Sequence, residues 1–115
     1  TKMHYRISVE QNGVHVGYLA YMKGSYSFFN SVGQLFACKD SAESRMLEAN
    51  WHNDRRQNHA QNILSDTIAH PKQTWTLSKN MRNAQTKPNA MFLSERKALV
   101  ETLSSTRYSI VEVDL

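Results

Sequence analysis

The sequence predicts a single α+β domain, residues 1–115, with a mainly antiparallel sheet of four to five strands. Three observations predict this class. Two alternating apolar runs flank an Asn-Gly pair, which is typical of a hairpin. A long helical segment ends before Pro71, and residues 107–113 are rich in β-branched and aromatic side chains. In chain order the elements read βββ-α-β-α-β, with a long polar helix packed on one side of the sheet.

The register of the first hairpin follows from its turn. An Asn-Gly loop favours a type I′ turn, because both central residues need positive φ. The predicted cross-strand pairs are Gln11/Val14, Glu10/His15, Val9/Val16, Ser8/Gly17, Ile7/Tyr18, Arg6/Leu19, Tyr5/Ala20, His4/Tyr21 and Met3/Met22. We therefore expect one face to be buried, formed by Met3, Tyr5, Ile7, Val9, Val16, Tyr18, Ala20 and Met22.

The next elements are a third strand and the long helix. Tyr26–Asn30 follows a second corner and alternates as a strand, and residues 34–37 extend briefly. Asp40 and Glu43 have the spacing of a capping box, which predicts a helix that starts near Ser41 and runs to His70.

Apolar residues of this helix fall in two portions that we expect to be buried. The first contains Ala42, Met46, Leu47, Ala49 and Trp51, and the second contains Ala60, Ile63, Leu64 and Ile68. Eight consecutive polar residues, 52–59, separate them. Either one helix crosses solvent there, or two helices meet at this polar joint.

The rest of the chain predicts a strand, a loop, a helix and a strand. Thr74 to Ser78 alternates as a short strand, and residues 79–88 are polar and basic, as in a loop. Ser94 is a candidate N-cap for a helix over residues 95–103, with Ala98, Leu99 and Leu103 directed inward. Apolar residues on both faces of the last segment, residues 107–113, predict an interior strand.

Composition limits the class of protein. With 115 residues, 40% of them hydrophobic, the chain can build one modest core. The single cysteine, Cys38, excludes an internal disulfide, and we expect it to be a small buried hydrophobe. No apolar run approaches the roughly 18 residues of a membrane span, so we expect a cytoplasmic protein. A net charge of +4 permits a nucleic acid or an acidic protein surface as partner.

The polar joint, with its flanks, is the first candidate binding site. Arginines supply phosphate partners, and Asn, Gln and His side chains can contact base edges or phosphate oxygens. The same residue types also suit a plain solvated helix face. The candidate residues are Arg45, His52, Asn53, Arg55, Arg56, Gln57, Asn58 and His59.

The second candidate lies after Pro71, where a tryptophan stands among cations. Trp75 is accompanied by Lys72, Lys79, Arg82 and Lys87. Aromatic and basic residues so interleaved resemble a stacking platform beside a nucleic-acid backbone. The alternative is that Trp75 belongs to the core.

The third candidate is the outward face of the hairpin, which carries His4, Arg6, Glu10, His15 and Tyr21. A carboxylate opposite a histidine forms a general acid/base pair, and an arginine beside them binds phosphate. A metal-independent ribonuclease can be built in this way. The alternative is a solvated hairpin face. We expect neither a metal site nor a cofactor.

The overall arrangement resembles that of small accessory proteins encoded by phages and prophages. The resemblance rests on the Asn-Gly hairpin, the corner from Phe36 to Ala42, and the terminal strand Tyr108-Ser109-Ile110-Val111-Glu112-Val113. It implies a non-enzymatic binding protein in the host cytoplasm that blocks or redirects a host macromolecule, such as a defence complex. The alternatives are direct nucleic-acid binding at the first two sites, and a small ribonuclease at the third.

Overall fold

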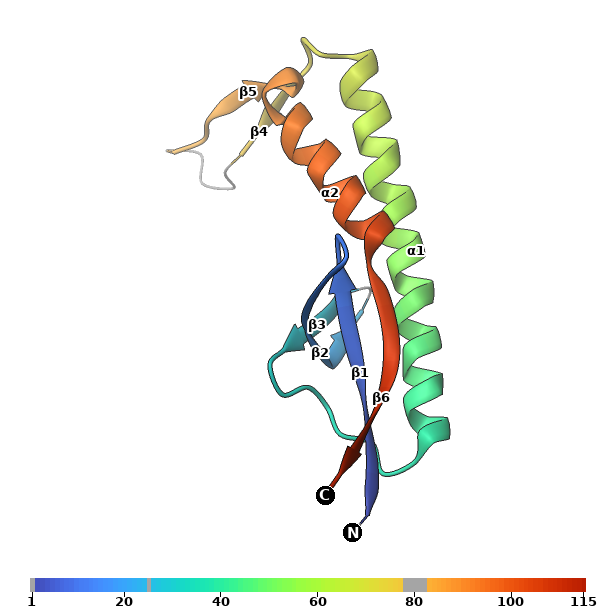
Figure 1. Ribbon diagram of the computed structural model, residues 1–115. Coiled ribbons are helices and arrows are strands. Elements are labelled where there is room, and N and C mark those ends of the chain that lie inside the picture. Colours follow the sequence, from blue (N-terminus) through green and yellow to red (C-terminus); the bar gives the residue numbers. More distant parts are fainter. Residues whose placement is uncertain (1, 25, 78–82) are drawn as a thin grey trace.

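The computed structural model describes residues 2–24, 26–77 and 83–115, and it confirms the α+β class and the order of the elements. Four antiparallel strands form the main sheet, in the spatial order β3-β2-β1-β6. These strands are β1 (Met3–Gln11), β2 (Val14–Lys23), β3 (Tyr26–Asn30) and β6 (Arg107–Asp114). The helix α1 (Lys39–Ala69) packs along one side of the sheet and continues well beyond it (Figure 1).

The first hairpin has the predicted turn but a different register. Asn12 and Gly13 both have positive φ, 55° and 77°, and Glu10 lies opposite His15. A β-bulge follows, so that Val9 pairs with Gly17, and the predicted pairs from Val9/Val16 outward are wrong. One extra residue in β2 exchanges the two faces of that strand next to the bulge. A second register shift, between Leu19 and Tyr21 in the pairing with β3, precedes Met22, which packs against the core as predicted.

The bulge changes which side chains reach the core. Leu19, predicted to face outward, is only 1% exposed, whereas Val16 is 38% exposed. Gly17 makes the bulge possible, because a Cβ at this position would lie 2.7 Å from the backbone oxygen of Asn30. The core beneath the sheet consists of Ile7, Val9, Leu19, Phe36, Ala42 and Ala49, with Tyr5, Met22, Met46, Tyr108 and Ile110 packed against it.

The segment between β3 and α1 continues the ladder of β1. Tyr5 exchanges two backbone hydrogen bonds with Phe36, at N···O distances of 2.8 and 2.7 Å. Gly33 passes so close to β2 that a Cβ there would lie 2.4 Å from the Cβ of Tyr18, and its φ is +75°. The predicted extension at residues 34–37 is therefore limited to one bridge at Phe36.

The polar joint lies within one continuous helix of 31 residues, which settles the two alternatives. This helix begins at Lys39, two residues before the predicted Ser41; Cys38 is the N-cap residue and makes no side-chain cap bond, so the predicted capping box is wrong. Cys38 is exposed, because it precedes the first turn and is not packed beneath it. The predicted end is confirmed, since the helix stops at Ala69 before Pro71.

One stripe of α1 is buried; it includes four of the predicted residues, Ala42, Ala49, Ala60 and Leu64, and two that were not predicted, Asn53 and Thr67. Its buried members are Ala42, Ala49, Asn53, Ala60, Leu64 and Thr67, at helical spacings of three, four and seven. Small side chains let the helix lie close to the sheet. Leu47 and Trp51, expected to be buried, are 67% and 55% exposed.

A second, two-stranded sheet lies at the far end of α1. It consists of β4 (Thr74–Thr76) and β5 (Thr86–Pro88), followed by the 3₁₀ turn η1 (Asn89–Phe92) and the helix α2 (Leu93–Ser105). The loop prediction for 79–88 is thus wrong at residues 86–88, and residues 78–82 lie outside the described residues. The helix begins at Leu93, one residue before the predicted cap, Ser94.

The packing of α2 and β6 also differs from the prediction. On α2, Leu103 is buried as expected, but Ala98 and Leu99 are exposed. The last strand, β6, lies at an edge of the main sheet, so the predicted interior position is wrong. Ile110 packs against the core, and Val111 points by alternation to the opposite face of the sheet.

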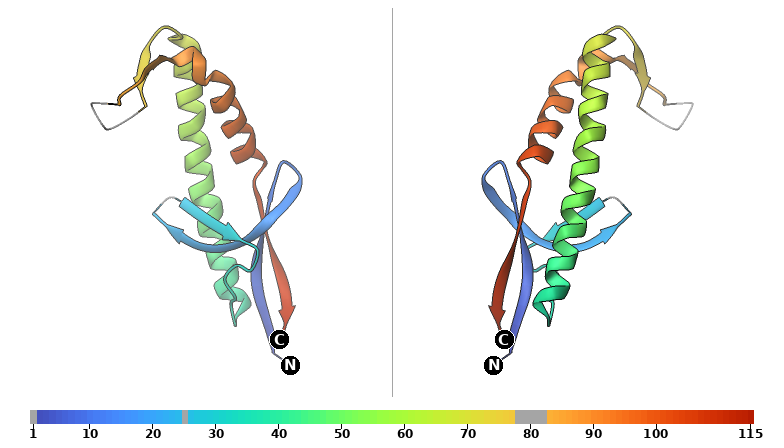
Figure 2. Two further views of the ribbon diagram at one scale, coloured as in Figure 1. Left: turned by 90° about the vertical axis from the view of Figure 1, so that its left-hand side faces the viewer. Right: turned by 90° about the vertical axis from the view of Figure 1, so that its right-hand side faces the viewer.

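The molecule is elongated. Its extents are 60 × 29 × 21 Å and its radius of gyration is 18.0 Å, whereas a compact domain of this length has a radius of about 13 Å. The main sheet lies against one half of α1 and α2 lies against the other half, while the second sheet extends away from the end of α1 (Figure 2). The second half is less well covered, and it contains the candidate site.

Candidate functional site

A groove runs between α1 and α2, in two adjoining hollows. The first has a volume of about 600 Å³ and is lined by Tyr26, His52, Arg55, Arg56, His59, Ala60, Ile63, Leu99 and Leu103. The second has a volume of about 570 Å³ and is lined by His59, Ala60, Asn62, Ile63, Asp66, Gln73, Thr74, Trp75, Asn89, Arg96 and Leu99. Four shared lining residues make the two hollows continuous. We refer to both together as the α1–α2 groove.

The floor of the groove is apolar. Ala60 and Leu103 are buried, at 5% and 4% exposure, and they close the groove from below. Ile63 and Leu99 are 38% and 46% exposed and line both walls above them. These two side chains leave apolar surface in contact with water, at a cost of about 25 cal/mol for each Å².

The rim is basic and comes from the predicted polar joint. His52, Arg55, Arg56 and His59 all line the first hollow. The guanidinium carbon of Arg56 lies 5.3 Å from the ring centre of Tyr26, a cation–π contact that joins β3 to the helix. The helical spacing of the four residues, three and four apart, places them along one side of α1.

Arg55 has an aromatic neighbour on its own helix. Its guanidinium carbon lies 4.9 Å from the ring centre of the exposed Trp51, and the Trp51 ring packs edge-on against His52 at 4.8 Å. This stacking restricts the long side chain of Arg55. An arginine already held in place loses less conformational entropy when it binds an anion.

The second hollow brings Trp75 to the same groove. The Trp75 ring, 51% exposed, packs edge-on against Phe92 at 5.5 Å between ring centres. The guanidinium carbon of Arg96 lies 5.2 Å from the ring centre of the same Phe92, and the guanidinium donates a hydrogen bond to the Thr67 hydroxyl. The structure therefore places the first two predicted sites, the polar joint and Trp75, along one continuous surface.

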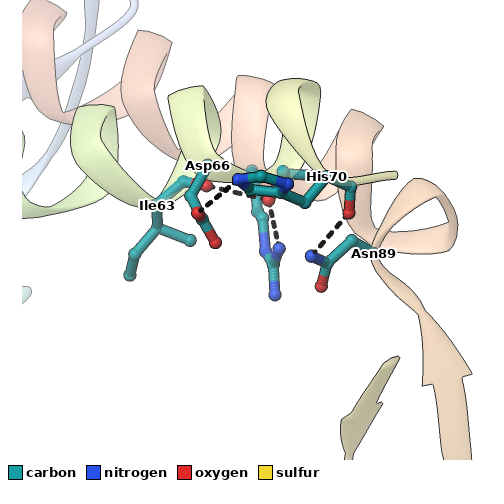
Figure 3. Close-up of polar contacts among 6 residues, drawn as sticks. Ile63, Asp66, His70 and Asn89 are labelled. Carbon is teal, nitrogen blue, oxygen red and sulfur yellow. Dashed lines mark hydrogen bonds and ion pairs between the residues drawn. The ribbon is translucent and has the colours of Figure 1, made fainter. Parts of the chain in front are cut away.

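Polar contacts fix the end of α1 beside this hollow. Oδ1 of Asp66 lies 4.0 Å from Nε2 of His70, and the side-chain N–H of Asn89 donates to the His70 carbonyl at 3.1 Å; both contacts are drawn in Figure 3. The backbone N–H of Asn89 also donates to the Gln73 carbonyl, at 2.8 Å. Among the described residues, Asp66 is the only acidic one that lines either hollow, so their lining has an excess of positive charge.

The remaining predicted residues of the first two sites are placed less directly. Arg45 lines a separate hollow near the start of α1, beside Asp40 and Glu48. Gln57 is partly buried. Lys87 lies opposite Trp75 in the β4–β5 ladder, and Lys79 and Arg82 lie outside the described residues.

Asn53 has a structural position. It is 7% exposed, and its side-chain N–H donates to the carbonyl of Leu103 at 3.0 Å. That carbonyl belongs to the last turn of α2, where carbonyl groups have no partner within the helix. Asn53 therefore joins the two helices below the groove, and its side chain does not reach the surface where a ligand would bind.

The third predicted site is assembled only in part. Glu10 lies opposite His15, but Nδ1 of His15 lies 2.9 Å from the hydroxyl of Ser8. The Arg6 guanidinium is stacked on the Tyr18 ring, 3.6 Å from its centre. Tyr18 also packs edge-on against His15 at 4.9 Å. The bulge thus places Tyr18 between Arg6 and His15 on this face, where the three side chains stack.

Several groove residues were not predicted from the sequence as binding residues, among them Tyr26, Ile63, Arg96 and Leu99. Ile63 and Leu99 were expected to be core residues, because apolar residues at helical spacing are usually buried. Arg96 lies three residues before Leu99, and this i, i+3 spacing was the available signal that both share one side of α2.

Comparison with family models, curated proteins and solved structures finds no match for this chain. Within the described residues, none of the helices has the length and apolar character needed to cross a membrane. Over the same ranges, His, Cys, Asp and Glu side chains do not gather in groups of three that could hold a metal ion.

Proposed function

We propose that this protein is a non-enzymatic binding protein that holds an acidic, partly apolar segment of another protein in the α1–α2 groove. The observation that carries the proposal is the composition of the groove. An apolar floor with Ile63 and Leu99 exposed above it lies beneath a rim of Arg55 and Arg56, in the loosely packed half of an elongated chain. Apolar surface with an arginine rim is typical of a protein-binding surface.

The resemblance to phage and prophage accessory proteins supports the proposal that the partner is a host macromolecule. A small protein of this kind acts by occupying a surface of a host macromolecule, such as a defence complex, and thereby blocking or redirecting it. Occupation needs a groove and complementary charge and no reacting groups. The α1–α2 groove supplies both of these features.

Single-stranded nucleic acid is the second candidate ligand. Tyr26 and Trp75 are 59% and 51% exposed, and each lines one of the two hollows. Exposed aromatic rings among arginines suit stacked bases and a phosphate backbone. The protein ligand is favoured because nucleic-acid interfaces are more polar and more strongly basic than this groove.

Site-specific photo-crosslinking tests the proposal. A benzophenone amino acid is placed at Leu99 in the groove or, as a matched control, at Leu47, a leucine that is exposed outside the groove. Each protein is irradiated in a lysate of the cells in which the protein is found, and crosslinked species are identified, produced and purified. We expect a partner that crosslinks from position 99 and not from position 47, and that loses affinity for the Arg55→Ala/Arg56→Ala variant.

Two results would overturn the proposal. One is equal crosslinking, or none, at both positions. The other is tight binding of RNA or single-stranded DNA that falls steeply with added salt and depends on Arg55, Arg56 and Trp75. That second result would establish the nucleic-acid alternative.

A further inference from the structure

We propose that the segment recognised by the α1–α2 groove is an amphipathic helix of about four turns, with acidic side chains beside its apolar stripe. This inference rests on the proposed function and adds the conformation, length and charge of the partner segment. Three observations carry it: the nature of the groove walls, the spacing of the lining residues, and the distribution of charge.

Between Tyr26 of β3 at one end and β4 at the other, the walls of the groove are two helices, and this favours a helical occupant. Within α1 and α2 the backbone N–H and C=O groups are bonded to one another, apart from the ends. Over the stretch between the two helices, an extended segment would lose its backbone hydrogen bonds to water without gaining others. A helix satisfies its own backbone groups and offers only side chains, which is how helices occupy apolar grooves in other proteins.

The spacing of the lining residues sets the length. On α1 they extend from His52 to Asp66, which is a rise of about 21 Å at 1.5 Å for each residue. On α2, Arg96, Leu99 and Leu103 lie three and four residues apart and face the same groove. A helix of about 14 residues, with apolar side chains at positions i, i+4, i+7 and i+11, matches this length.

The charges of the rim set the charge of the partner helix and where along it the acidic side chains lie. Arg55 and Arg56 lie with two histidines in the first hollow, and Arg96 lies in the second. Asp66, the one acid among the described lining residues, is in the second hollow beside His70. We therefore expect acidic side chains along the partner helix, most densely at the end that lies beside Arg55 and Arg56.

Designed peptides provide the probe. The test peptide is a fluorescein-labelled, end-capped helix of 16 residues with leucines at i, i+4, i+7 and i+11 and glutamates on the flanking positions. One control peptide has the same residues in an order that breaks the leucine stripe, and a second has lysine in place of every glutamate. Fluorescence anisotropy at two salt concentrations gives the affinities, and circular dichroism checks the fold of each protein variant.

Variants of the protein provide the second half of the test. Leu99→Gln changes the groove, and Leu47→Gln makes the same change at an exposed leucine outside it. We expect the test peptide to bind about tenfold more tightly than either control peptide, a difference of ~1.4 kcal/mol. Leu99→Gln should weaken binding by about fivefold or more, and Leu47→Gln should leave it unchanged.

Several outcomes would overturn the inference. It fails if the three peptides bind equally, if Leu99→Gln has no more effect than Leu47→Gln, or if an oligothymidylate of 16 nucleotides binds more tightly than the test peptide. It also fails if light scattering finds a dimer that Leu99→Gln dissociates, because a second copy then occupies the groove. If the crosslinked partner from position 99 engages the groove through an extended segment, this inference fails while the proposed function stands.

Discussion

Replacing Asn53 by alanine tests the connection between the two helices below the groove. The Asn53 side chain is 7% exposed and donates to the carbonyl of Leu103 at 3.0 Å. Its removal leaves that carbonyl with only the backbone N–H of Thr106, at the long distance of 3.4 Å. A buried polar group that loses its partner costs about 1–3 kcal/mol. We expect Asn53→Ala to lower the free energy of unfolding by about 2 kcal/mol.

Asn58→Ala is the matched control, because it makes the same change five residues along α1 at an exposed position. Alanine has a higher helix propensity than asparagine, by about 0.6 kcal/mol, and this gain is common to both variants. The difference between the two variants therefore isolates the buried contact. Urea denaturation followed by circular dichroism measures both free energies of unfolding, and equal m-values would show that the two transitions are comparable.

If Asn53→Ala were as stable as Asn58→Ala, the reasoning would be refuted. Asn53 would then be a solvated residue of the polar joint, available to a ligand, as its sequence context suggests. Loss of stability with unchanged peptide affinity at 10 °C, where the fold is retained, would assign Asn53 a structural role alone.

Two further pairs of matched substitutions test the fold. Leu19→Ala should lower the free energy of unfolding by about 2–5 kcal/mol and Leu47→Ala by less than about 1 kcal/mol, because Leu19 is 1% and Leu47 67% exposed. If urea denaturation gave the reverse order, the hairpin register without a bulge would be correct. Gly33 and Gly13 have nearly the same positive φ, so replacing either by alanine costs about 1–2 kcal/mol in backbone strain. At Gly33 the new Cβ would also lie 2.4 Å from the Cβ of Tyr18, whereas at Gly13 it would have no described atom within 4 Å. Gly33→Ala should therefore melt at a lower temperature than Gly13→Ala, and equal melting temperatures would contradict the close approach of this loop to β2.

Local signals in the sequence predicted the elements, because each has a local physical cause. The Asn-Gly turn depends on φ at two residues, and the end of α1 depends on the proline at position 71. Both are confirmed. The bulge in β2 has no such cause, since it depends on the close approach of Gly17 to Asn30 on another strand. A register counted outward from the turn therefore fails beyond His15.

Burial on α1 was predicted correctly at its alanines and Leu64 but misread elsewhere, for a related reason. Large apolar side chains such as Leu47 and Trp51 dominate any periodicity count, yet the helix is buried along alanines and along polar residues with specific partners. The side chain of Asn53 donates to the Leu103 carbonyl of α2, and the Thr67 hydroxyl accepts from Arg96 of α2. Both hydrogen bonds join two helices, so they depend on tertiary contacts that the sequence of one helix does not contain.

Part of the polar joint and Trp75 converge because α1 is long enough to join two regions. The polar joint and Trp75 are separated in sequence by the end of the helix and the turn at Pro71, so no spacing rule relates them. In the structure, α2 returns antiparallel beside α1 and brings both to one groove.

The same return explains why the groove is open. The core beneath the main sheet closes around Ile7, Val9 and Leu19, which are at most 1% exposed. At the other end of α1, α2 has only 13 residues and contributes a single buried residue, Leu103. Two packed helices bury only the sides that face each other, so Leu99 and Ile63 remain at the surface. A third helix in the groove would bury these two side chains.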